Sequence, residues 1–212
     1  MSASNQTVST ADYSAIVAVP AITTPVSTER LFDRNYKENG DSPIDQFLKN
    51  SNALNLLWLN GDNISRELAT VAFLGYMSAV ESYVRSLVRG LILIDPHSLK
   101  VAEEKNITFG AALHHSKQLL PEALMDEYSF VHSGNIKETF KGLIGIDLSL
   151  DERVVKEFDK ICQLRHCCVH RFGKLGAKNA MKLGLNTHNS LFEKPLILGK
   201  DELNLIAGNI RS

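Results

Sequence analysis

Residues 65–94 carry an unbroken helical stripe of apolar side chains, and a chain that contains such a segment has few folds open to it. The stripe is formed by Leu68, Val71, Ala72, Met77, Val80, Val84, Leu87 and Leu91. Asn63 or Ser65 can cap its start, and Asp95-Pro96 ends it. About thirty residues is far longer than the average α-helix of roughly 11 to 12 residues. The segment is therefore predicted to be the spine of a helical bundle.

A second helix is predicted before the long one, and the folded domain is expected to begin with it. Ser42 is suited to the N-cap and Pro43 to the first helical position, and an apolar pattern continues to Trp58, which is assigned to the core. Residues 1–42 are rich in Ser, Thr, Asn and Pro, so they are expected to form a largely irregular arm. Within this arm, residues 15–19 are compatible with a short strand or with packing on a partner.

Shorter pieces are expected between the long helix and the next main one. Helical turns are predicted over residues 97–104, 108–120 and 122–131, and the pattern is expected to break at three glycines, Gly134, Gly142 and Gly145. This region is therefore interpreted as an inserted connection between two main helices.

The last main helix begins after Ser149 or Asp151, either of which can cap it, and Phe172-Gly173 is expected to end it. A short helix over residues 176–185 should follow. Because strand patterns are scarce, the fold class is predicted to be all-α, an up-and-down helical bundle with short extra helices between the main ones. The predicted domain spans residues 43–190, and residues 191–212 are expected to form a carboxy-terminal extension.

Cysteine usage and hydropathy indicate the compartment. The three cysteines lie within seven residues, at positions 162, 167 and 168, which is not the spread of a disulfide framework. Neighbouring Cα atoms lie about 3.8 Å apart, closer than the roughly 4.4 Å lower limit of usual disulfides. Residues 1–10 hold no basic side chain and no apolar run approaches ~18 residues, so neither a signal peptide nor a membrane span is expected. A reducing cytoplasm is the predicted location.

Chemically active side chains are unusually dense near the end of the last main helix. Arg165, His166 and His170 lie there together with Cys167 and Cys168. Charged groups at such a density need water or partners, so a plain core pattern does not explain them. On an ideal helix the first and last of the three polar residues differ by about 140°, so Arg165 and His170 do not share one face.

This segment resembles a known motif, that of the HEPN (higher-eukaryote and prokaryote nucleotide-binding) family, in which Arg and a polar residue are followed by variable positions and His. The residues that carry the resemblance are Leu164-Arg165-His166-Cys167-Cys168-Val169-His170-Arg171-Phe172-Gly173. Glu81 on the long helix is similar to the acidic residue of the family's second helix, and the likeness covers about residues 45–188.

The resemblance implies ribonuclease activity without a metal or cofactor, in a toxin–antitoxin or antiviral-defence setting, with an antitoxin or defence protein as a possible partner. It also implies a homodimer with the active site in the dimer cleft. His170 would transfer protons, Arg165 would hold the phosphate with its two-pronged guanidinium, and Glu81 or His166 would position them. Two protomers would let Arg165 and His170 face one groove from both sides.

The charge near the motif agrees with an RNA target. Residues 153–182 hold eight Lys and Arg against two acids, in a chain whose formal net charge is -1. If the segment after the motif is helical, Lys174, Lys178 and Lys182 form one basic stripe on it. These lysines and Arg171 are the predicted RNA-binding residues. The alternative interpretation of the stripe is an ordinary solvated helix face.

Other interpretations of the same residues stay open. Cations at a helix end complement its dipole, and Glu81 lies four residues before Arg85, which suits a surface ion pair. Cys162, His166 and His170 fall within an arc of about 80° on a helix and are ligand types that zinc accepts. A non-catalytic helical dimerisation module that binds RNA, a nucleotide or a protein is the competing function. Cys167 and Cys168 are expected to face the bundle rather than act as nucleophiles.

Overall fold

A computed structural model describes residues 27–37, 40–61, 63–126, 128–185 and 188–211. The chain divides into two compact units, Met1–Asn39 and Gly40–Ser212. In the first unit, the described residues hold one short 3-10 helix, η1 (Thr28–Leu31). The strand considered at residues 15–19 lies outside the described residues.

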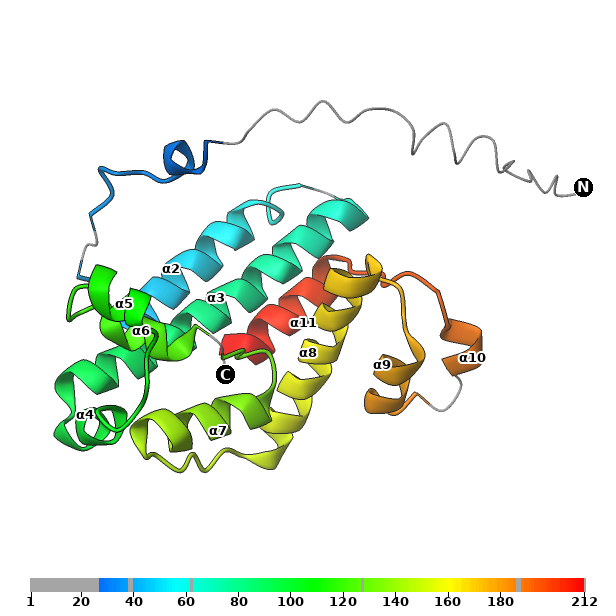
Figure 1. Ribbon diagram of the computed structural model, residues 1–212. Helices are drawn as coiled ribbons and strands as arrows, with labels where there is room; N and C mark the ends of the chain where they lie inside the picture. The colour runs from blue at the N-terminus through cyan, green and yellow to red at the C-terminus, as the bar shows by residue number, and fades with distance from the viewer. Residues whose placement is uncertain (1–26, 38–39, 62, 127, 186–187, 212) are drawn as a thin grey trace, which may run out of the picture. The chain divides into compact units, whose positions relative to one another are not determined.

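The second unit is all-helical, as the sequence predicts. Four of its longer helices are α2 (Pro43–Leu56), α3 (Arg66–Ile94), α8 (Glu152–Arg171) and α11 (Lys200–Arg211). They lie side by side in Figure 1, with α3 in contact with each of the other three. The described residues contain no strand, only one isolated antiparallel bridge between Lys174 and Pro195. The remaining helices are α4 (Pro96–Ala102), α5 (Phe109–His114), α6 (Leu120–Met125), α7 (Ser133–Ile144), α9 (Ala177–Lys182) and α10 (His188–Leu191).

The main helices begin where their capping residues predict. The Ser42 side chain accepts a hydrogen bond from the Asp45 amide at the start of α2, and Ser65 accepts one from the Leu68 amide at the start of α3. Asp151 does the same for α8. Each cap satisfies one of the backbone N–H groups that have no partner inside the helix. No helix in the described ranges is long and apolar enough to cross a membrane.

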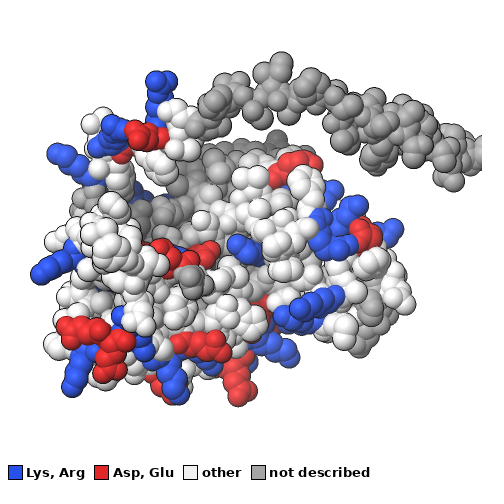
Figure 2. Space-filling view, in the orientation of Figure 1, with Lys and Arg blue, Asp and Glu red and all other residues white. Residues whose placement is uncertain are grey.

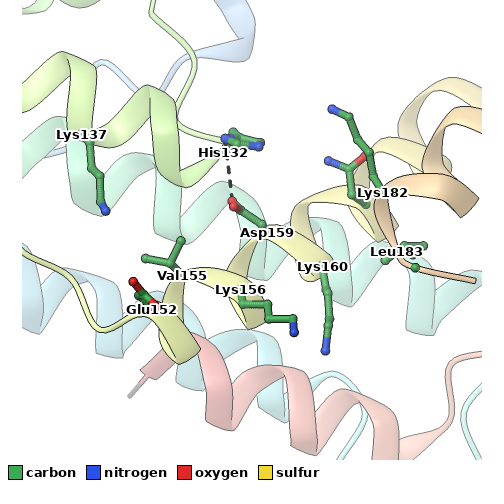
Figure 3. A pocket seen from close by; sticks show the side chains of 11 residues that line it. His132, Lys137, Glu152, Val155, Lys156, Asp159, Lys160, Lys182 and Leu183 are labelled. Atoms are coloured by element: carbon green, nitrogen blue, oxygen red, sulfur yellow. Dashed lines mark ion pairs between the residues drawn. The ribbon is translucent and has the colours of Figure 1, made fainter.

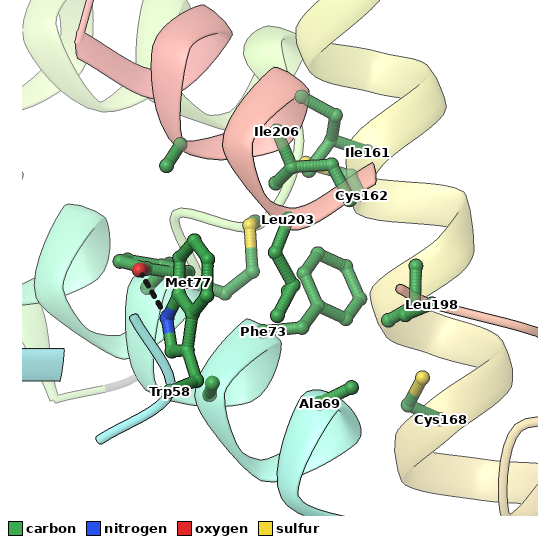
Figure 4. Close-up of a cluster of buried hydrophobic side chains, with 13 residues drawn as sticks. Trp58, Ala69, Phe73, Met77, Ile161, Cys162, Cys168, Leu198, Leu203 and Ile206 are labelled. Atoms are coloured by element: carbon green, nitrogen blue, oxygen red, sulfur yellow. Dashed lines mark hydrogen bonds between the residues drawn. The ribbon is translucent and has the colours of Figure 1, made fainter. Parts of the chain in front are cut away.

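The core follows the length of α3. One cluster of buried side chains joins the first half of α3 to α8 and α11, and a second joins its later half to α4, α6 and α7. Figure 4 shows the first cluster, in which the Trp58 Nε1–H donates to the Tyr76 hydroxyl at 2.9 Å. The Tyr76 hydroxyl in turn donates to Asn55 Oδ1. The polar ends of these two buried rings are therefore satisfied, and the assignment of Trp58 to the core is confirmed.

The carboxy-terminal segment is part of the helical core, so the predicted domain limit at residue 190 is wrong. Residues 191–212 were expected to be an extension, but α11 packs against α3 and α8. Leu203, Ile206 and Ala207 of this helix are buried in the first core cluster. Their three- and four-residue spacing gives α11 an apolar face that would otherwise be exposed to water.

The predicted break of the helical pattern at three glycines after residue 131 is also wrong for two of them. Gly134 and Gly142 do not break the chain but lie within α7, and only Gly145 ends the helix, in the left-handed conformation at φ 70°. Phe140, Leu143 and Ile144 are buried on the same helix, and their burial outweighs the roughly 1 kcal/mol that a helical glycine costs relative to alanine. The helices predicted at 108–120 and 176–185 exist with narrower limits, as α5 and α9, whereas the one predicted at 122–131 is shifted toward the amino terminus, because α6 begins at Leu120 and ends at Met125.

Two glycines near the end of α7 are expected to respond in opposite directions to alanine. In Gly145→Ala the new Cβ would lie 2.8 Å from His97 Nε2 and 3.0 Å from Val101 Cγ2. The left-handed backbone adds about 1–2 kcal/mol, so the variant should unfold more easily. A Cβ added at Gly142 would meet no atom of the described residues within 4 Å, so Gly142→Ala should stabilise by about 0.5–1 kcal/mol. Urea unfolding followed by circular dichroism checks both, and equal shifts would contradict the cap assignment.

Candidate functional site

The helix α8 carries the motif on its last two turns. All three cysteines of this helix are buried. Arg165 is half-buried, and His166 and His170 are exposed. The helix ends where predicted, with Phe172 in the left-handed conformation at φ 52° and Gly173 at φ 82°. Arg165 and His166 thus give the end of this helix a polar face, and that face carries the candidate site.

A pocket of about 200 Å³ opens on this polar face. Arg165 and His166 line it from α8. Lys178 and Lys182 line it from α9, and His132, the N-cap residue of α7, lines it from a third side. Three separate elements thus surround one small opening with cationic and imidazole groups, a composition suited to an anionic ligand.

The charge on this side of the molecule is visible in the space-filling view. Blue side chains predominate at the right of Figure 2, where Figure 1 shows α8 and α9, whereas both colours are mixed at the lower left. The basic side chains of residues 153–182 contribute to this excess of positive charge. The rest of the chain offsets it to a formal net charge of -1.

The two motif histidines contact each other. They are one helical turn apart on α8, and their ring centroids lie 4.3 Å apart at an interplanar angle of 47°. Partial burial lowers the pKa of His166 from its usual value of 6.5, and the nearby charges of His170 and Arg165 lower it further, as do those of Lys178 and Lys182. His166 is therefore held in its neutral form, which can accept a proton, at a pH where an isolated histidine begins to be charged.

His170 occupies a different position from Arg165. It does not line the pocket that Arg165 and His166 line, and it reaches the pocket's edge only through its contact with the His166 ring. This placement agrees with the angular separation of Arg165 and His170 on a helix.

His132 belongs to the pocket, although the sequence pattern did not single it out. Its Nδ1 accepts a hydrogen bond from the Gly134 amide at 3.1 Å and lies 3.8 Å from Asp159 Oδ1. Asp159 also accepts hydrogen bonds from the amide and hydroxyl of Ser133, both at 2.9 Å. These contacts join the start of α7 to the middle of α8. The only local signal is the position of a polar side chain before a helix, which says nothing about a distant motif.

Glu81 lies elsewhere in the helical unit. Its Oε1 is 4.0 Å from Arg85 Nη2, one turn later on α3. Arg85 also donates to the backbone carbonyls of Met125 and Tyr128, at 3.1 and 2.8 Å. Glu81 does not line the pocket of Arg165 and His166. Glu81 therefore makes the surface ion pair with Arg85 that is the alternative to a role in the site.

The predicted basic stripe is divided in two. Lys178 and Lys182 lie one turn apart on α9 and line the pocket. Lys174 lies before this helix, which has Gly176 as its N-cap, and forms an isolated antiparallel bridge with Pro195. The Lys174 Nζ lies 3.8 Å from Glu193 Oε2, and Arg171 forms an ion pair with the same carboxylate. The expectation of one continuous helical stripe is therefore wrong, and Arg171 and Lys174 tie α8 to the segment before α11.

The cysteines are poor candidates for chemistry. Burial raises the pKa of Cys162 to about 12, with the nearby Asp159 carboxylate adding to the effect, and burial raises that of Cys168 to about 11. Their thiols therefore stay protonated, whereas a nucleophile must be a thiolate. Within the described part of the chain, no three His, Cys, Asp or Glu side chains gather closely enough to hold a metal ion. The alternative zinc site at Cys162, His166 and His170 is thus not formed.

Comparisons of this chain with protein-family models, with characterised proteins and with solved structures find no match.

Proposed function

We propose that this protein is a metal-independent endoribonuclease of the HEPN type that cleaves RNA by attack of a ribose 2′-hydroxyl on the adjacent phosphate. The observation that carries the proposal is the convergence of Arg165, His166, Lys178 and Lys182 on one pocket, with His170 against the His166 ring. Its setting as a toxin or antiviral-defence effector in the cytoplasm rests on the resemblance of residues 164–173. Free, buried cysteines are compatible with that compartment.

The proposed reaction moves two protons. The 2′ oxygen bonds to phosphorus and loses its proton to a neutral imidazole, while the bond from phosphorus to the 5′ oxygen breaks and that oxygen receives a proton from an imidazolium. The products are a 2′,3′-cyclic phosphate and a free 5′-hydroxyl. Arg165 stabilises the extra negative charge on the phosphate oxygens. His166, whose pKa is lowered, supplies the neutral ring, and His170 exchanges protons beside it.

A homodimer would complete this site, because the accepting and donating groups act on opposite sides of the phosphorus. A second copy would bring another pair of histidines to a shared cleft. Apolar side chains beside the motif support such an interface: Phe172 is 87% exposed and Val169 is 47% exposed. Large apolar groups that remain in contact with water next to a polar site are typical of surfaces that a partner covers.

The test is a cleavage assay in the presence of EDTA. Purified protein is incubated with a single-stranded RNA, and the product ends are examined. Cleavage with 2′,3′-cyclic phosphate ends is the expected result. Binding of the RNA without cleavage would contradict the proposal and favour the alternative, a non-catalytic module that binds RNA or a partner. Loss of cleavage on chelation would contradict the metal-independent mechanism.

The histidine pair should also be detectable by titration. In an NMR titration of the imidazole Cε1–H signals, His166 should have its midpoint below 6.5, because burial and nearby positive charge oppose its protonation. In His170→Gln the midpoint should rise toward 6.5 without reaching it, since the charge of His170 is removed and the burial remains. A midpoint above that value, or one that the substitution leaves unchanged, would show that the two rings do not interact as the structure has them.

A further inference from the structure

A second, larger opening continues the pocket of the motif. It has a volume of about 520 Å³ and lies between the start of α7, the first half of α8 and the end of α9. His132, Gln163 and Lys182 line both openings, so the two form one groove. Figure 3 shows His132 and Asp159 between Lys137 of α7 and Lys182 of α9. The groove therefore leads away from Arg165 along the surface of α8.

Cationic side chains outnumber acidic ones in the walls of this groove. Six Lys and Arg side chains line its two parts against two acids, Glu152 and Asp159. Both carboxylate oxygens of Asp159 already accept hydrogen bonds from Ser133. Among the described residues, Lys137, Lys156 and Lys182 have no ion-pair partner, whereas Lys160 is 2.6 Å from Glu157. Unpaired cations in a concave surface concentrate field and attract an extended anion.

His132 presents a defined hydrogen-bonding group at the junction of the two parts. Its Nδ1 is occupied by the Gly134 amide, so the neutral ring carries its proton on Nε2. The bonds between Asp159 and Ser133 hold the start of α7 against α8 and so fix the place of this ring. The remaining ring nitrogen is thus a donor in a groove lined by lysines, which suits a phosphate oxygen.

We propose that this groove binds the sugar–phosphate backbone of the RNA strand next to the scissile phosphate, an inference that rests on the proposed ribonuclease function. Lys137 and Lys156 neutralise phosphates in the larger part, and His132 donates to a phosphate where the strand passes toward Arg165. The strand is single, because cleavage through a 2′-hydroxyl needs an unpaired backbone that can adopt an in-line geometry. Contacts to phosphate carry no base preference, so the groove binds many sequences alike.

Binding is tested with a single-stranded oligonucleotide that carries 2′-O-methyl groups and therefore cannot be cleaved by this reaction. The double variant Lys137→Gln/Lys156→Gln should weaken its binding on the order of tenfold at low salt, and should reduce the slope of log K against log salt by about 1.4. The matched control is Lys100→Gln/Lys105→Gln, whose lysines are exposed in and just after α4 and lie outside the groove. It should bind like the wild type. Equal affinities for the two double variants would overturn the proposal.

A third variant tests the junction. His132→Asn keeps a side-chain acceptor at the N-cap of α7 but loses the ring nitrogen that faces the groove. Its unfolding temperature should match that of the wild type, and it should bind the oligonucleotide several-fold more weakly. A variant that folds normally and binds as tightly as the wild type would remove His132 from the inference.

The groove and the ribonuclease function can fail separately. If RNA is cleaved but binding ignores Lys137 and Lys156, the groove proposal is overturned and the proposed function stands. If binding depends on these lysines but RNA is never cleaved, the groove stands and the enzyme proposal fails. A polyglutamate chain that binds as tightly as the oligonucleotide, with the same dependence on the lysines, would overturn the choice of RNA in favour of an acidic protein.

Discussion

His170→Ala is expected to lower RNA cleavage by about 10²- to 10⁴-fold, the range that a positioned proton-transfer group contributes. The loss should appear in the rate of the chemical step, with little change in affinity for RNA, because His170 lies outside the pocket that Arg165 and the lysines line. Folding should be retained, since the side chain is exposed on the last turn of α8. Single-turnover cleavage in EDTA, with unfolding monitored in parallel, measures both quantities.

The matched control for this substitution is His114→Ala. His114 is also an exposed histidine in the last turn of a helix, α5, and it lies outside the groove. It therefore reproduces the loss of an imidazole at a helix carboxyl end without touching the site. The control should cleave like the wild type. If His170→Ala retained full activity in a preparation free of contaminating nuclease, His170 would not be the proton-transfer residue.

Leu203→Ala is expected to have the largest effect on stability, a loss of about 2–5 kcal/mol in the free energy of unfolding. Leu203 is fully buried in the cluster that joins α11 to α3 and α8. Removing its methyl groups forfeits transfer free energy and leaves a cavity among close-packed side chains. A loss of this size is a large part of the total stability of a typical domain, so the motif helix should also lose its support.

Leu205→Ala provides the control on the same helix. Leu205 is 66% exposed, so its substitution should change the free energy of unfolding by no more than about 0.5 kcal/mol. Urea unfolding of both variants, followed by far-ultraviolet circular dichroism, gives the comparison. Similar small effects for the two leucines would mean that α11 is not part of the core and that residues 191–212 are an extension after all.

Much of the helical framework could be predicted from local pattern. The long apolar stripe, the serine caps at 42 and 65, the aspartate cap at 151 and the stop at Phe172-Gly173 all appear in the structure where the sequence places them. Each depends only on residues within a turn or two, because capping groups and helical periodicity act over three or four residues. The all-α class followed from the same short-range signals.

Two helices that local pattern did not predict, α7 and α11, depend on partners distant in the chain. Gly134 and Gly142 made α7 resemble a broken segment, but burial of Phe140 and Leu143 against α3 and α4 stabilises it. For α11, the apolar spacing was present in residues 200–211, but only its packing on α3 and α8 distinguishes a core helix from a tail. Helix propensity is a weak guide where tertiary burial decides.

For the candidate site, the order of residues in the chain by itself determined the contact of His166 with His170, because residues four apart on a helix face the same side. It also determined the divergence of Arg165 from His170 and the inward position of Cys167 and Cys168. Only the tertiary structure decided that His132 and the two α9 lysines surround Arg165, and that Arg171 and Lys174 are engaged by Glu193. The difference is physical: helical spacing is set by local geometry, whereas contacts between distant segments depend on how buried faces pack.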